Sequence, residues 1–285
     1  MTIEQIPVME LPNQLLMCPP QFFQVREVKN EFMRSHIGNV DAARARIQWE
    51  QLRSTFEDCG ITVQLLDALP ECEDMVFTAN PSFNGRAANG ERICVPSRMA
   101  FSSRQPEVAA HRAWFDMHGY TIKELPEDVE RFEGGGDALW HPGRELIWAG
   151  VGARTERRAH DALGAIFGVR VVSLELADPR FYHLDTCFCA LSERTVLMYP
   201  GAFTESGLAQ IRELFADVIE VDEEEATRSL ACNAAAFHGD AVVVQAGAAR
   251  IVRELTRRGF TVREVETGEF LKSGGSVFCM KAGLH

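Results

Sequence analysis

The eight cysteines of this chain show no paired C-x-x-C spacing, and no apolar run approaches the length of about 20 residues that crosses a membrane. The cysteine pattern therefore indicates neither a zinc knuckle nor a disulfide framework. Residues 1–7 lack the basic start and the apolar core of a signal peptide. We expect a cytoplasmic protein with reduced thiols, no metal site, no targeting segment and no membrane insertion.

Basic residues are also in the minority, with 29 Lys and Arg against 41 Asp and Glu and a formal net charge of −12. A nucleic-acid partner would require a basic face, so this charge argues against one, whereas an acidic pocket attracts small cations. The length of 285 residues and the apolar content of 46% suffice for a sizeable core. We expect a globular protein with a small cationic partner, and a homo-oligomer stays among the alternatives.

Helical segments recur along the chain, separated by short β-rich stretches that glycine and proline bound. The predicted helices cover residues 39–59, 104–118, 154–167, 204–215 and 248–259. The last four begin roughly 50 residues apart, a period that indicates a modular α/β architecture with two or three strands and one helix in each unit. Strand-like runs lie between the helices, for example at 62–66, 170–176 and 195–199. Because no linker interrupts this regularity, we expect residues 1–285 to form one closed domain.

Local signals mark where some helices begin and end. Asp41 stands near the start of the first predicted helix, and Gly60 can take the left-handed conformation that ends it. The acidic run at 222–225 is typical of a solvated helix start. The buried stripe of the first helix is predicted to contain Val40, Ala43, Ile47, Leu52 and Phe56.

Polar residues and glycines gather in six separate segments that fall in different repeats. These segments are residues 74–81, 97–98, 132–137, 152–155, 182–188 and 273–279. If a ring of units directs these segments at one central pocket, a cysteine, a histidine and several carboxylates converge there. Such a set is what a thiol nucleophile requires for attack on an electron-poor carbon carried by a cation. The pattern favours an enzyme.

The combination of these motifs resembles the guanidino-group-modifying enzymes, the pentein superfamily, which includes arginine deiminase, dimethylarginine dimethylaminohydrolase and glycine amidinotransferase. The resemblance runs from the Met-Cys-Pro-Pro sequence at 17–20 through Cys279. It implies an α/β fold, a five-bladed pseudo-symmetric propeller of ββαβ units. It also implies that Cys279 is the nucleophile, that His183 is the general acid and base, and that Glu133 steadies both the guanidinium and the histidine.

The same resemblance implies the substrate-binding residues. Asp74 and Asp185 match carboxylates that bind the guanidinium, and Arg98 and Arg154 match positions that hold the substrate's α-carboxylate. A guanidinium is planar and delocalised, so paired carboxylates orient it through parallel N–H···O bonds while the thiolate approaches its central carbon. The implied partner is a free guanidino amino acid, and no cofactor is required.

Asn80 departs from the pattern of the deiminases and methylarginine hydrolases, which carry an aspartate there. An aspartate only accepts hydrogen bonds, whereas an asparagine also donates and can hold the carbonyl oxygen of citrulline for a second attack. The products would then be ornithine, carbon dioxide and two ammonia. The chain is similar to arginine dihydrolases also at 178–189 and 269–275, and Asn30 matches a second amide of their pocket.

Other interpretations of these residues stay open. Taken alone, Cys279 could be a small buried hydrophobe, His183 a core histidine and Arg154 part of a solvated helix face. Within the enzyme class, dimethylargininase or arginine deiminase would stop at citrulline, and an amidinotransferase would use an amine instead of water. In another class, the same propeller occurs without its catalytic set in a ribosome-associated initiation factor. Retention of the cysteine, the histidine and the glutamate together favours the hydrolase.

Overall fold

Five three-stranded sheets make up the part of the chain that the computed structural model describes, residues 2–285. Each unit has an antiparallel strand pair, then a helix, then a third strand parallel to the second. Four of the units follow one another in chain order. The first consists of β3 (Ser82–Arg86), β4 (Arg92–Pro96), α2 (Gln105–Met117) and β5 (Thr121–Ile122), and the second of β6 (Ala138–Trp140), β7 (Leu146–Val151), α4 (Arg157–Phe167) and β8 (Arg170–Glu175). The third consists of β9 (Phe188–Ala190), β10 (Thr195–Met198), α5 (Glu205–Leu214) and β11 (Asp217–Glu220), and the fourth of β12 (Ala235–Phe237), β13 (Ala241–Gln245), α7 (Ala249–Arg257) and β14 (Thr261–Val265).

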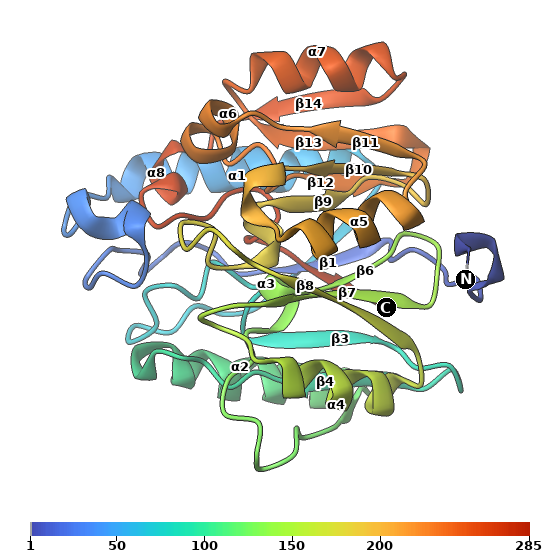
Figure 1. The fold of residues 1–285 in the computed structure, drawn as a ribbon. Helices are drawn as coiled ribbons and strands as arrows, with labels where there is room; N and C mark the ends of the chain where they lie inside the picture. The colour runs from blue at the N-terminus through green and yellow to red at the C-terminus, as the bar shows by residue number, and fades with distance from the viewer. Residues whose placement is uncertain (1) are drawn as a thin grey trace.

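The fifth unit joins the two ends of the described chain. Strand β15 (Ala282–Leu284) pairs antiparallel with β1 (Gln14–Met17), which is followed by α1 (Ala42–Asp58) and by the parallel strand β2 (Thr62–Leu65). The long helices lie at the periphery, and the strands lie toward the middle (Figure 1). The predicted five-bladed α/β propeller of ββαβ units is confirmed.

Short helices occupy the connections between the strands. They are η1 (Ile3–Gln5), η2 (Glu31–Ser35), η3 (Ser102–Arg104), α3 (Gly134–Asp137), η4 (Leu184–Thr186), η5 (Pro200–Ala202), α6 (Glu223–Arg228), η6 (His238–Asp240) and α8 (Gly268–Leu271). Within residues 2–285, no helix combines the length and the apolar character that crossing a bilayer would require.

The five predicted long helices are confirmed, with ends that differ by up to three residues. The side chain of Asp41 accepts hydrogen bonds from the backbone N–H groups of Ala43 and Arg44, the second and third residues of α1, and Gly60 has a φ of 81° just beyond its end. The side chain of Asp222 caps α6 by accepting one hydrogen bond, from the backbone N–H of Glu225. These signals were readable in the sequence because a cap is made by neighbours along the chain.

The predicted buried stripe of α1 is partly wrong. Ile47 is 65% exposed, and Ala43 is exposed as well. The buried face is rotated from the predicted one and contains Ala45, Gln48, Trp49, Leu52 and Phe56. The spacing of Trp49, Leu52 and Phe56 fixes this face, because the large Trp49 side chain packs into the core.

The five segments that precede the first strand of each unit are linked to one another in a closed circle. Hydrogen bonds join each to the next: the N–H of Gly135 donates to the carbonyl of Ala79 at 2.7 Å, and the N–H of Leu184 to Asp137 at 3.0 Å. The side chain of Asn233 donates to the carbonyl of Asp185 at 2.9 Å. Two more bonds close the circle, from the N–H of Phe278 to the carbonyl of Asn233 and from the N–H of Ala79 to the carbonyl of Cys279, both at 3.1 Å. We call these five linked segments the belt.

Candidate active site

A cavity of about 20 Å³ lies at the belt. Cys279 lines it together with four other residues that the sequence predicted, which are Asn30, Asp74, Asn80 and Arg154. Three further predicted residues contact this lining from behind, as the distances below show: Glu133, His183 and Asp185. The structure thus gathers at one place residues from four of the five belt segments and from the connections beside them.

His183 and Glu133 form the buried pair behind the cavity. The Nε2 atom of His183 lies 2.7 Å from Oε2 of Glu133, which also accepts from Nη1 of Arg154 at 2.8 Å. Burial alone would raise the pKa of Glu133, but the hydrogen bond and charge of His183 and the charge of Arg154 outweigh it and lower the pKa to about 2. Glu133 is therefore a carboxylate that fixes both the imidazole and the guanidinium of Arg154.

The substitution Glu133→Gln is expected to lower the free energy of unfolding at pH 7 by on the order of 3 kcal/mol, because the buried Arg154 loses its partner. The folded pKa of Glu133, about 2, lies below its ordinary value of 4.5. The wild-type carboxylate therefore stabilises the fold above that value and loses this effect as the pH falls toward 2.

Urea denaturation between pH 7 and pH 3 measures this difference. The stability gap between wild type and Glu133→Gln should be constant near neutral pH and narrow below about pH 4.5. Glu130→Gln is the control, because Glu130 is exposed and its carboxylate has no ion pair within the described residues. A gap that widens in acid would contradict the ionisation state assigned to Glu133.

Cys279 is held between a carboxylate and an amide. Its Sγ atom lies 3.0 Å from Oδ2 of Asp185 and 3.1 Å from Nδ2 of Asn233. Burial raises the pKa of the Cys279 thiol well above its usual range, and the Asp185 carboxylate adds to the rise. Burial likewise raises the pKa of Asp185 to about 7. A cation that enters between Cys279 and Asp185 would reverse both effects.

Two buried carboxylate oxygens, one on Asp74 in the cavity lining and one on Asp185 beside the thiol, have neither a hydrogen-bond partner nor an ion-pair partner among residues 2–285. These atoms are Oδ1 of Asp74 and Oδ1 of Asp185. Asp74 is also held by cations, since its Oδ2 atom lies 3.0 Å from Nζ of Lys29 and 4.0 Å from Nε of Arg104. Buried carboxylate oxygens are normally paired, so these two can accept the N–H groups of a planar cation.

The orientation of Asn80 follows from its neighbours. Its Oδ1 atom accepts from Nη1 of Arg104 at 3.1 Å, which turns its Nδ2 atom toward Nδ1 of His183 at 3.5 Å. A Cβ atom at Gly136 would collide with this amide and lie 3.1 Å from the imidazole. The triple-glycine segment therefore allows Asn80 and His183 to come together.

Asp137 forms a hydrogen bond with the segment that carries His183. Its Oδ2 atom accepts from the hydroxyl of Thr155 at 2.7 Å, and its Oδ1 atom accepts from the N–H of Leu184 at 3.0 Å. The residue does not line the cavity. These contacts give Asp137 the structural task of placing His183.

Arg154 and Asn30 also line the cavity. Arg154 is only 4% exposed and precedes α4 instead of opening it, so the alternative of a solvated helix face does not hold. Its guanidinium also donates to the carbonyl of Lys29 at 2.6 Å and lies over the ring of Tyr182. The side chain of Asn30 donates to the carbonyl of Ser273 at 2.9 Å.

Arg98 is the predicted residue that the structure does not bring to the cavity. Its guanidinium donates to the backbone carbonyls of Leu125, Pro126 and Val129, and its own backbone bridges to Phe132. Arg98 therefore fastens the 125–129 loop and does not line the cavity, and its contact with a substrate carboxylate stays a prediction. A guanidinium is satisfied equally well by carbonyls that the fold supplies from another segment.

Three residues of the cavity region were missed in the sequence. Arg104 and Lys29 line the cavity as buried cations. Lys29 pairs with Glu73 of a distant segment, whereas Arg104 pairs with Glu107 three residues along the chain, a local signal that could have marked it. Asn233 left a signal in the repeats. It stands two residues before β12, as Asn80 stands two residues before β3, in the one unit to which the sequence assigned no functional residue.

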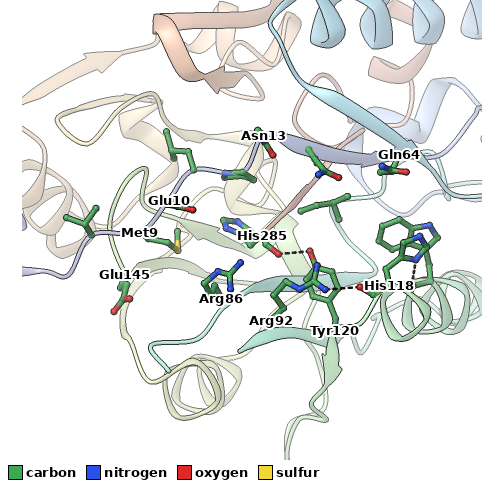
Figure 2. A pocket seen from close by; sticks show the side chains of 16 residues that line it. Met9, Glu10, Asn13, Gln64, Arg86, Arg92, His118, Tyr120, Glu145 and His285 are labelled. Carbon is green, nitrogen blue, oxygen red and sulfur yellow. Dashed lines mark hydrogen bonds between the residues drawn. The ribbon is translucent and has the colours of Figure 1, made fainter. Parts of the chain in front are cut away.

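A larger cleft, of about 550 Å³, lies elsewhere and is drawn in Figure 2. Arg86, Arg92, Tyr120 and His285 face it, and the hydroxyl of Tyr120 donates to the carbonyl of His285. The cleft has no cysteine in its lining and shares no lining residue with the cavity at Cys279. Volume alone therefore does not identify the candidate active site, which we place at the smaller cavity because Cys279 lines it.

The fold and the gathered thiol, imidazole and carboxylates are those of the guanidino-group-modifying, or pentein, superfamily. A family model described as N,N dimethylarginine dimethylhydrolase, eukaryotic, matches residues 19–285. The dimethylarginine dimethylaminohydrolase of Mycobacterium tuberculosis is 37% identical over 272 residues, which cover 94% of this chain and 85% of that protein. The chain belongs to the dimethylarginine dimethylaminohydrolase family.

Arginine dihydrolases of cyanobacteria are equally similar. The bifunctional arginine dihydrolase/ornithine cyclodeaminase ArgZ of Synechocystis sp. is 39% identical over 269 residues, which cover 94% of this chain and 37% of that protein. The crystal structure of the N-terminal domain of ArgZ bound to product superposes with a TM-score of 0.89 at 36% identity, and covers 97% of this chain and 98% of that domain. The chain thus spans little more than a third of the length of the bifunctional relatives.

Proposed function

We propose that this chain is an arginine dihydrolase that converts arginine and two waters to ornithine, carbon dioxide and two ammonia. The observation that carries the proposal is the amide of Asn80, which faces His183 in the cavity that contains Cys279. The likeness to ArgZ supports it, since one ArgZ structure is of a cysteine-to-serine mutant bound to substrate and another of an asparagine-to-serine variant covalently bound to a reaction intermediate.

In the proposed reaction, Asp74 and Asp185 bind the guanidinium through the two free carboxylate oxygens. The cation lowers the pKa of the Cys279 thiol, whose proton passes to His183. The thiolate then forms a C–S bond with the central carbon, and His183 protonates the departing amine as the C–N bond breaks. Ammonia leaves, and an S-alkylthiouronium remains on the enzyme.

Hydrolysis of this intermediate uses His183 in the opposite direction. The imidazole takes a proton from water as the water oxygen bonds to the carbon, and the C–S bond breaks to return the thiolate. The Glu133 carboxylate, 2.7 Å from His183, stabilises the imidazolium that each half-reaction forms. The product is citrulline, which carries a carbonyl oxygen where arginine carried a cationic nitrogen.

The second hydrolysis, which converts citrulline to ornithine, depends on Asn80. Its Nδ2–H group can donate to the ureido oxygen, whereas an aspartate would repel that oxygen. The same thiol then attacks the ureido carbon and expels the second ammonia, and hydrolysis and decarboxylation give ornithine. Dimethylargininase is the second candidate, favoured by the family match and by the relative from M. tuberculosis, and it would stop at citrulline.

The proposal also covers the compartment, the domain organisation and the partner of the enzyme. The proposed nucleophile must stay a free thiol, which a reducing compartment preserves, so we place the protein in the cytoplasm. The pairing of β15 with β1 supports a single catalytic domain over residues 1–285. The partner is a free, cationic guanidino amino acid, and a homo-oligomer is an alternative to the monomer.

Labelling of the thiol distinguishes this enzyme from a binding module. We expect iodoacetamide to label Cys279, to abolish ammonia release from arginine in proportion to labelling, and to react more slowly when ornithine is present. Peptide mass spectrometry with an ammonia assay measures both. Full ammonia release from protein labelled completely at Cys279, or no release before labelling, would contradict the proposal.

A further inference from the structure

Asn233 holds the position in the fourth unit that catalytic groups hold in the others. The belt segments before β3, β6, β9 and β15 carry the residues assigned above, and the segment before β12 carries Asn233. An asparagine has no acid or base chemistry at neutral pH, so its place in this ring calls for another explanation.

Every hydrogen-bonding atom of the Asn233 side chain is used, and the residue is fully buried. Its Nδ2 atom donates to Sγ of Cys279 at 3.1 Å and to the carbonyl of Asp185 at 2.9 Å. Its Oδ1 atom accepts from the N–H groups of Ser276, Phe278 and Cys279 at 3.0 to 3.2 Å. The second bond of Nδ2 fixes the direction of the N–H group that meets the sulfur.

Backbone strain supports this placement. Leu230 is buried and has a φ of 43°, a left-handed conformation that is rare for a leucine. Its carbonyl accepts the N–H of Asn233 at 2.7 Å, so the strained turn leads directly into the asparagine. Strained residues of this kind persist where the surrounding structure holds them, and they gather at functional sites.

We propose that Asn233 is a catalytic residue that stabilises the thiolate of Cys279 by hydrogen bonding. Its N–H group faces the sulfur when the thiolate forms, and again when the sulfur leaves as the C–S bond breaks. The inference deepens the proposed function and rests on the assignment of Cys279 as the nucleophile.

The surroundings of the sulfur explain why such a donor is required. Charged or titratable groups that interact with Sγ include the carboxylate of Asp185, the phenol of Tyr182 and the amine of Lys281. The cavity lining that Cys279 shares adds the charged side chains of Lys29, Asp74, Arg104 and Arg154. Asp185 lies 3.0 Å away and disfavours negative charge on the sulfur, as burial does. A neutral amide stabilises the thiolate without pairing with the carboxylates that the substrate needs.

Two substitutions test the role without any turnover of substrate. Asn233→Asp keeps the oxygen that accepts from the 276–279 backbone but replaces the donor, and Asn233→Ser is a neutral substitution that separates the lost donor from the added charge. The rate of alkylation of Cys279 by iodoacetamide, followed by mass spectrometry from pH 6 to pH 10.5, reports its thiolate. Thermal unfolding confirms that the variants are folded.

We expect the alkylation profiles of both variants to move to higher pH, by about one unit or more in Asn233→Asp. The kcat for arginine should fall by about 10²-fold while KM changes by less than about threefold. A merely structural role predicts the opposite, because a loosened 276–279 loop would expose the thiol, move the profile to lower pH and speed alkylation. Profiles that are unchanged or lower in both folded variants would overturn the inference.

Failure of the proposed function would appear differently. If Cys279 is not the nucleophile, Cys279→Ser retains ammonia release, whatever the alkylation profiles of the Asn233 variants show. If Cys279 is the nucleophile and Asn233 does not assist it, Cys279→Ser is inactive while both Asn233 variants keep the wild-type alkylation profile.

Discussion

Replacing Cys279 with serine is expected to reduce ammonia release from arginine by a factor on the order of 10⁴ or more. A serine hydroxyl keeps nearly the same shape between Asp185 and Asn233 but does not ionise under these conditions. Binding of arginine should persist, because the free oxygens of Asp74 and Asp185 are unchanged. An ammonia assay combined with titration calorimetry separates the lost chemistry from the retained binding.

Cys59→Ser is the matched control for this experiment. Cys59 is a free, half-buried cysteine just after α1, and it does not line the cavity. Its substitution should leave kcat at the wild-type value. Residual activity of Cys279→Ser within about tenfold of wild type would remove the thiol from the proposed reaction.

Replacing Asn80 with aspartate is expected to stop the reaction at citrulline. The new carboxylate would still accept a hydrogen bond from Arg104, so the first hydrolysis continues. The N–H group that donates to the ureido oxygen of citrulline in the second hydrolysis is lost. A missing donor and a repelled oxygen together should slow ornithine formation by about 10²-fold or more. Chromatography of the products over time measures citrulline and ornithine separately.

Asn89→Asp serves as the control for Asn80→Asp. Asn89 is exposed in the turn between β3 and β4, where its side-chain oxygen accepts from the N–H of Glu91, a contact that aspartate also makes. Its product ratio should match that of the wild type. An undiminished yield of ornithine from Asn80→Asp would mean that the amide does not control the second hydrolysis.

Much of this fold could be predicted because its signals are local. The cap at Asp41, the left-handed Gly60 and the repeated helix starts depend on neighbours along the chain, and the structure confirms all of them. The face of α1 was mispredicted at Ile47, because packing against other elements decides which of several apolar residues is buried.

The functional residues also differ in how readily the sequence predicts them. Family motifs brought Cys279, His183 and Glu133 to attention, and the structure places them in one connected region. Arg98 lies outside the cavity lining because carbonyls of a separate loop bind its guanidinium. Arg104 was missed although its partner Glu107 lies three residues along the chain, because a single sequence does not reveal that this pair is buried beside Asp74.

The products formed from arginine test the central claim most directly. Purified protein is incubated with arginine, and citrulline, ornithine and ammonia are quantified until arginine is consumed. The account predicts ornithine as the end product with two ammonia released for each arginine, and citrulline only in passing. Citrulline as the sole end product, with one ammonia for each arginine, would contradict the role of Asn80 and leave a deiminase.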